Sequence, residues 1–153
     1  MDSPVGIMRR IRWIPVVTVL CIVAMIALII VYFPSRYAVS GKVAVSVDAD
    51  PSKIQRGESA TIEVEVKNLD KSEEKTINIE AVTFDDSFLF TDTDSKKAAK
   101  QDIAVGPQET REIKFKVKAS SDALLGKYRV DVTAREKLYS EGAKDTVYIR
   151  VLE

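Results

Sequence analysis

The residues of this chain that are best suited to chemistry gather between Thr83 and Asp102, a stretch with five aspartates and three lysines. Calcium needs roughly six to eight oxygen ligands, and paired aspartates can supply them. Four aspartates are candidates for this role: Asp85, Asp86, Asp92 and Asp94. However, no glycine turn or distal glutamate completes an EF-hand loop, and Lys96, Lys97 and Lys100 would repel a cation. We therefore expect a solvated loop that binds no calcium.

The same stretch mixes aromatic rings with charge, which suits contact with a partner protein. Long loops between strands often carry recognition residues, because the sheets beneath hold them in place. The candidate partner-binding residues are Phe84, Phe88, Phe90, Asp92, Asp94, Lys96 and Lys97. The alternative is that the three rings pack into the core and only the charges face water. If two of the rings are exposed, they form the best contact patch of the chain.

Several kinds of chemistry are excluded or disfavoured by the residue types. The chain has no histidine, which removes Ser-His-Asp catalysis and imidazole metal sites. Its only cysteine, Cys21, lies in an apolar run, so no disulfide forms within the polar part. From Gly41 onward the net charge is −3, which gives no reason to bind nucleic acid. We expect no enzyme activity and no cofactor.

An uncharged run from Ile14 to Phe33 predicts a membrane helix, because its 20 residues match the thickness of the hydrocarbon core. Arginines before the run place residues 1–12 in the cytoplasm by the positive-inside rule. We therefore predict a transmembrane helix at 13–33, a linker at 34–42 and an outward-facing domain at 43–153. The alternative is a signal peptide that is cut before Gly41, after the small residues Ala38-Val39-Ser40. Lipidation of Cys21 is disfavoured, since Leu20 stands where a small residue is expected.

Beyond Lys42 the apolar residues recur at every second position, which is typical of strands with one buried face. Alternating segments centre on Val45, Val64, Phe115, Val132 and Ile149. A third strand from Ile77 changes phase before Val82 and Phe84, which indicates a bulge or a bend. Phe88 to Phe90 form a further short strand. A single helical turn is possible from Lys96 to Gln101. The pattern predicts an all-β, seven-stranded antiparallel Ig-like sandwich.

Two segments resemble known families. Asp50-Pro51, Gly57-Glu58 and the stretch IEVEVKN at Ile62–Asn68 resemble the opening of the CARDB domain, a cell-adhesion-related Ig-like domain of bacteria and archaea. The segment Val105–Ala134 resembles the Ig-like module that accompanies carbohydrate-active enzymes, with Tyr128 in the position of a corner tyrosine. The resemblance implies an extracytoplasmic spacer, adhesion element or accessory domain. It carries over no binding residue.

Two functions remain open from the sequence. The first is a single-pass membrane protein whose Ig-like module binds another envelope or membrane protein or acts as a structural element of the cell envelope. The alternative is an accessory subunit that stabilises a larger membrane complex, such as a surface-filament motor, secretion machinery or a membrane enzyme. The linker spans at most about 30 Å, so we expect the module to sit close to the bilayer and to contact its neighbours sideways.

Overall fold

The structure is a computed structural model that describes residues 37–139 and 141–153. The predicted cytoplasmic segment 1–12, the predicted helix 13–33 and the first three residues of the predicted linker 34–42 lie outside this range. Within the described part, no helix is long and apolar enough to cross a membrane. The residues from Tyr37 to Glu153 form one compact unit.

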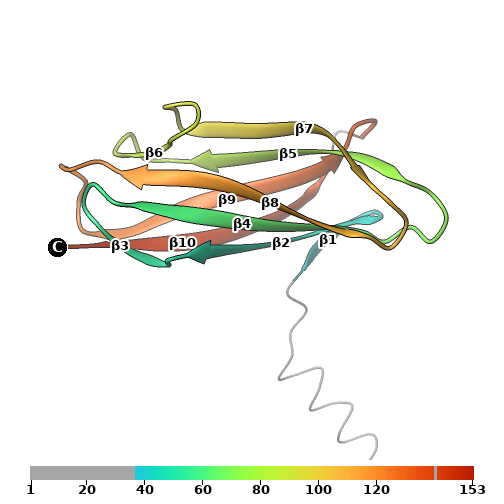
Figure 1. Cartoon of the computed structure of the whole chain (residues 1–153), viewed down its shortest axis with the longest axis horizontal. Coiled ribbons are helices and arrows are strands. Elements are labelled where there is room, and N and C mark those ends of the chain that lie inside the picture. Colours follow the sequence, from blue (N-terminus) through green and yellow to red (C-terminus); the bar gives the residue numbers. More distant parts are fainter. Residues whose placement is uncertain (1–36, 140) are drawn as a thin grey trace, which may run out of the picture. The chain divides into compact units, whose positions relative to one another are not determined.

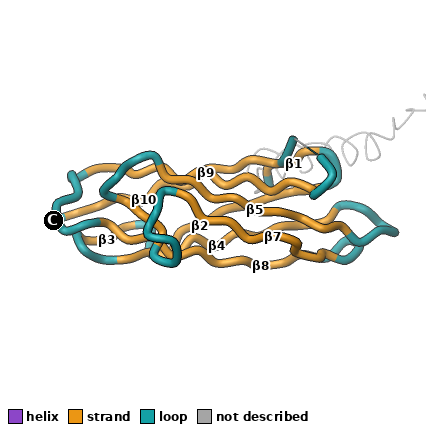
Figure 2. Tube along the Cα trace, turned by 90° about the horizontal axis from the view of Figure 1, so that it is seen from above, coloured by secondary structure: helices purple, strands orange, loops and turns teal. Residues whose placement is uncertain are grey.

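This unit is a sandwich of two five-stranded sheets, and Figure 2 shows that its described part consists of strands and loops alone. The first sheet has the order β1 (Ala38–Ser40), β2 (Val43–Asp50), β4 (Ser59–Asn68), β8 (Thr110–Ala119) and β6 (Phe88–Phe90). The second has the order β3 (Lys53–Gln55), β10 (Ala143–Leu152), β9 (Gly126–Glu136), β5 (Lys75–Thr83) and β7 (Lys97–Val105) (Figure 1). The predicted all-β sandwich is confirmed.

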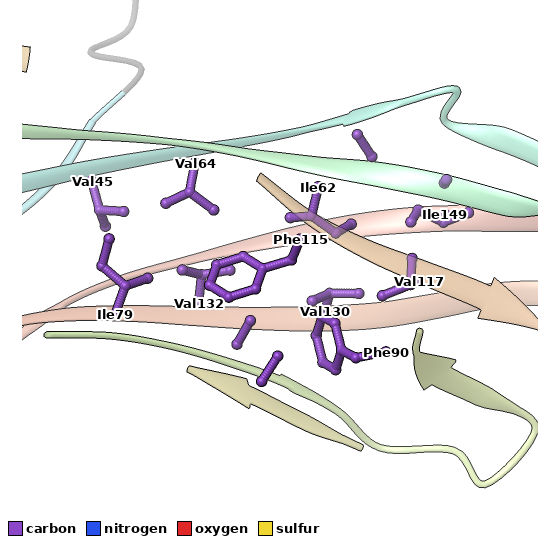
Figure 3. Close-up of a cluster of buried hydrophobic side chains, with 14 of the residues drawn as sticks. Val45, Ile62, Val64, Ile79, Phe90, Phe115, Val117, Val130, Val132 and Ile149 are labelled. Carbon is purple, nitrogen blue, oxygen red and sulfur yellow. The ribbon is translucent and has the colours of Figure 1, made fainter. Parts of the chain in front are cut away.

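The core lies between the two sheets, where the alternating apolar residues of each strand meet. Figure 3 shows Val64 and Phe115 of the first sheet directed toward Ile79 and Val132 of the second. All four side chains are buried, as the period-two pattern predicts. β4 keeps this alternation over its whole length, with inward residues buried and outward residues partly exposed. The inward face predicted around Val64 is therefore confirmed.

The strand count and the strand directions differ from the prediction of seven antiparallel strands. The described residues hold ten strands, and β3 runs parallel to β10. β1 lies within the segment predicted as linker. β3 is too short to show a period. β7 replaces the helical turn that was expected from Lys96 to Gln101.

The expected phase change in the third strand is also wrong. β5 keeps its alternation to the end, so Ala81 and Thr83 are buried, whereas Val82 and Phe84 face outward. The irregularity lies in the neighbouring strand: Ile77 pairs with Ile103, but Ile79 pairs with Lys100. One extra residue of β7 is thus accommodated opposite β5, which is a β-bulge.

Candidate partner-binding surface

The three phenylalanines of the predicted contact stretch separate into two groups. Phe88 and Phe90 are fully buried, whereas Phe84 is 61% exposed. The Phe88 ring stacks on Tyr128 with centroids 5.0 Å apart, and the Phe90 ring meets the edge of Phe115 at 6.0 Å. Phe88 and Phe90 are therefore core residues. Because a partner cannot reach these two side chains, the prediction that Phe88 and Phe90 take part in a contact is wrong.

The four predicted contact charges are not gathered around Phe84. Lys97 forms an ion pair with Glu80 of β5 at 2.7 Å, and Lys96 pairs with Asp86 at 2.8 Å. Asp94 lines a separate hollow with Leu89 and Phe90. Asp92 is exposed in the turn between β6 and β7. Lys96 is linked to the strand end beside Phe84, because its carbonyl oxygen accepts a hydrogen bond from the backbone N–H of Thr83 at 2.8 Å.

The four aspartates considered for calcium do not come together either. Asp85 accepts hydrogen bonds from the backbone N–H and the hydroxyl of Ser87, at 2.9 and 2.6 Å. These bonds lower the pKa of Asp85 below its usual value. In the part of the chain that the structure describes, no three Asp, Glu, His or Cys side chains are placed to hold a metal ion.

A different set of residues joins Phe84. Leu124 and Leu125, in the loop between β8 and β9, are 75% and 46% exposed. Together with Phe84 and Arg129 they line an open hollow of about 330 Å³. We call these four residues the Phe84 patch. Three large apolar side chains exposed around one hollow are unusual on a small water-facing domain and indicate a contact surface.

Arg129 adds a cation to this apolar group. Its guanidinium lies 5.4 Å from the centre of the Phe84 ring, which is a cation–π distance. Two hydrogen bonds from Arg129 to the Asp131 carboxylate, at 2.6 and 2.7 Å, hold the guanidinium in place. The same bonds raise the pKa of Arg129 above its usual value. The patch thus combines apolar area with a fixed guanidinium that is paired with an acidic side chain.

The fold brings the patch together from segments about 40 residues apart. β5 and β9 are paired so that Thr83 lies opposite Val130, which places Phe84 beside Arg129 at the sheet end. The Tyr128 hydroxyl donates a hydrogen bond to the carbonyl oxygen of Leu124 at 2.8 Å and so anchors the leucine loop. This is the corner-tyrosine contact that was expected for Tyr128. The signal that the prediction overlooked is the pair Leu124-Leu125, adjacent apolar residues that follow the polar residues Ser120 to Asp122.

Comparison with known proteins shows which solved structures share this fold. No family model matches the sequence, and no curated protein matches it. A crystal structure of a CARDB domain from Pyrococcus furiosus, in complex with di-metal ions, is 19% identical and has a TM-score of 0.50. The match covers 72% of this chain and 87% of that domain. The solution structure of the same domain is 18% identical, with a TM-score of 0.53 and coverage of 72% and 94%.

The fold is that of a CARDB-like module. The resemblance noted from Asp50-Pro51 and Ile62–Asn68 is therefore confirmed. The module shape also recurs in the N-terminal domain of an adhesin from Streptococcus gordonii, which is 11% identical and has a TM-score of 0.51. That match covers 71% of this chain and 32% of the adhesin structure. At these identities the comparisons show a shared fold alone.

Proposed function

We propose that the chain is a membrane-anchored, extracytoplasmic CARDB-like module that binds another protein of the cell envelope through the Phe84 patch. The observation that carries the proposal is the exposure of Phe84, Leu124 and Leu125 around one hollow. Burial of aromatic and aliphatic side chains supplies most of the binding free energy in a contact of this kind. Arg129 would orient the partner through the N–H groups that do not bond Asp131.

The anchor is supported by the apolar run from Ile14 to Phe33 and by the point at which the module begins. β1 starts at Ala38, within the nine-residue segment predicted as linker, so the chain between the apolar run and the module is shorter than predicted. A module on so short a tether meets proteins that lie beside it in the membrane more readily than distant ones. The CARDB-like fold itself suggests a structural or interaction role.

The anchor is tested on the full chain. Intact-mass analysis should find an N-terminus before Ile14, and the protein should stay in the membrane fraction after an alkaline carbonate wash, because surface contacts alone are broken by that wash. A mature N-terminus at Gly41 would overturn the anchor.

The contact is tested by changing the patch and measuring complex size after mild detergent extraction. The double variant Phe84→Ser, Leu125→Ser should lose its high-mass complex while keeping the melting temperature of the parent, since both side chains are exposed. The matched control is Val39→Ser, which removes a 57% exposed valine from β1 and should leave the complex intact. Equal complex recovery from all three proteins would refute the Phe84 patch as the contact surface.

The size of the parent complex distinguishes the two functions that the sequence left open. A stable assembly of defined mass would identify the chain as an accessory subunit of a membrane complex. A species that appears only after chemical crosslinking would identify a transient contact with a neighbour.

A further inference from the structure

A second group of exposed apolar residues lies at the other end of the module. Leu138 and Tyr139, in the hairpin between β9 and β10, are 87% and 62% exposed, and Val39 of β1 is 57% exposed. We call Leu138 and Tyr139 the hairpin tip. The 11 residues of β9 separate the tip from the Phe84 patch by about 35 Å. The two exposed apolar groups are therefore distinct surfaces.

The hairpin tip is close to the point at which the chain enters the module. Tyr139 lines one open hollow together with Ser40, the last residue of β1, and with Gly41 and Lys42, which follow it. The entry itself is held in place: β1 pairs with β2, and the hydroxyl of Tyr37 donates a hydrogen bond to Glu65 of β4 at 2.7 Å. Figure 1 shows β1 at the edge of its sheet, in the half of the sandwich that also carries the turn between β1 and β2.

The chain before this entry sets a limit on the distance to the membrane. Only Pro34, Ser35 and Arg36 separate Phe33, the end of the apolar run, from Tyr37. Four residue steps span at most about 14 Å, even when fully extended. The polar headgroup region is about 5–8 Å thick on each side of the hydrocarbon core. If the run is the anchor proposed above, the entry point lies within or just above the headgroups.

We propose that the hairpin tip docks on the outer surface of the bilayer, with Leu138 inserted among the lipids and Tyr139 at the headgroup level. Tyrosine suits this depth, because its ring is apolar and its hydroxyl can remain in water. Insertion removes from water a leucine side chain that the fold leaves almost fully exposed. The docking fixes the orientation of the module on its tether, and it rests on the proposed anchor.

The charges around the tip indicate which lipids are needed. Lys42 is paired with Asp70 at 2.6 Å, Lys75 with Glu136 at 3.3 Å, and Lys137 with Asp102 at 2.6 Å. Because these lysines already have acidic partners, they form no basic cluster that would require anionic lipid. The contact is therefore apolar and interfacial, and a zwitterionic bilayer suffices.

The experiment uses the full chain in phosphatidylcholine nanodiscs. Cys21→Ser removes the only cysteine, and Leu138→Cys then gives a single site for an environment-sensitive fluorophore. The matched control is Leu124→Cys, at a residue that is 75% exposed at the other end of β9. The label at 138 should show a blue-shifted emission, several-fold stronger quenching by lipid-borne nitroxide and protection from iodide. The label at 124 should show no blue shift, weak quenching by lipid-borne nitroxide and strong quenching by iodide.

The outcomes separate the docking from the anchor. A co-flotation assay on the same labelled proteins reports whether the chain is membrane-bound at all. Protein that floats with the lipid but shows iodide quenching at 138 as strong as at 124 would overturn the docking alone. Protein that does not float would overturn the anchor and, with it, the docking. Lipid quenching at 138 that needs anionic lipid would contradict the apolar contact proposed for the tip.

Discussion

At the residue scale, the side chain of Asn68, at the end of β4, links two loops of the module. It is fully buried, and its amide nitrogen lies 2.8, 3.0 and 3.1 Å from the carbonyl oxygens of Glu73, Val105 and Gly106. Its side-chain oxygen accepts a hydrogen bond from the backbone N–H of Asp70 at 2.9 Å. A buried amide that serves two loops in this way holds the β4–β5 and β7–β8 connections together.

We predict that Asn68→Ala lowers the free energy of unfolding by about 2–3 kcal/mol, because it leaves buried carbonyl oxygens and an N–H without partners. The control is Asn78→Ala, which removes a single hydrogen bond to the backbone of Asp102 on an exposed edge. This control should cost about 1 kcal/mol or less. Urea denaturation measures the free energy of unfolding of both variants. Equal decreases would show that the hydrogen bonds of Asn68 stabilise the fold no more than the single bond of Asn78.

Asp70 gives the same end of the module a dependence on pH. Its carboxylate accepts a hydrogen bond from Lys42 at 2.6 Å and another from the backbone N–H of Ser72 at 3.0 Å. These contacts, that with Lys42 first, hold the pKa of Asp70 well below its usual value. Because the folded pKa lies below the unfolded one, the ionised carboxylate stabilises the fold above pH 3.8 and loses this effect as the pH falls further.

We therefore predict that Asp70→Asn is less stable than the parent at neutral pH, and that the difference shrinks as the pH falls below about 4. The asparagine keeps an oxygen for the N–H of Ser72 but loses the charge that binds Lys42. Urea melts at a series of pH values check this. A difference that stays constant down to pH 2.5 would assign the effect to packing instead of charge.

At the element scale, the strands that could be predicted are those with an alternating face. Val64, Phe115 and Val132 each lie in such a segment, and each is buried. β7 could not be recognised, because it is an edge strand whose residues from Ala99 to Asp102 are all exposed, so its sequence has no period. β1 and β3 have three residues each, which is fewer than two periods of a strand.

The residues of the candidate site could likewise be predicted only where neighbouring residues in the sequence mark them, and not where strand pairing brings them together. Phe84 stands out locally, as an aromatic residue followed by two aspartates. Its neighbours Leu124 and Leu125 become visible only when β5 pairs with β9, which is a contact across about 40 residues of sequence. Burial of Phe88 and Phe90 likewise depends on β6 joining β8. Spacing along the chain cannot supply such pairings.

The exposed edge of β7 leads to a prediction about self-association. Lys100 lies in the middle of this edge and is exposed, and a charge there discourages pairing with a second chain. We expect Lys100→Val to aggregate faster on mild heating, as measured by light scattering. Lys118→Val is the control, because Lys118 lies on β8 between β4 and β6, where both sides are already paired. Equal aggregation of the two variants would show that edge pairing is not the cause.

At the scale of the whole molecule, the first strand decides where the module begins. The sequence pattern placed the start at Val43, whereas the compact unit begins at Tyr37. β1 adds three residue pairs to the edge of β2, and Tyr37 adds its bond to Glu65. These contacts belong to the fold, although they lie in the segment expected to be linker.

We predict that a fragment of residues 37–153 unfolds cooperatively and is more stable than one of residues 43–153. The expected difference is about 1–3 kcal/mol, from the lost hydrogen bonds and the exposed edge of β2. Thermal and urea unfolding of the two fragments would measure it. Equal stability would mean that β1 is only loosely attached.

The position of β1 also determines how the protein responds to mechanical load. With the proposed anchor and the proposed contact, a pull between the membrane and the Phe84 patch would reach the sandwich through β1, a strand of three residues at the edge of its sheet. β1 should peel away first and release residues 37–42, which lengthens the tether by about 20 Å while the remaining strands stay folded. Single-molecule force spectroscopy should record this as a small reversible step before the main unfolding event. Because β1 would detach before the other strands unfold, it would limit the force that reaches the contact under sudden tension.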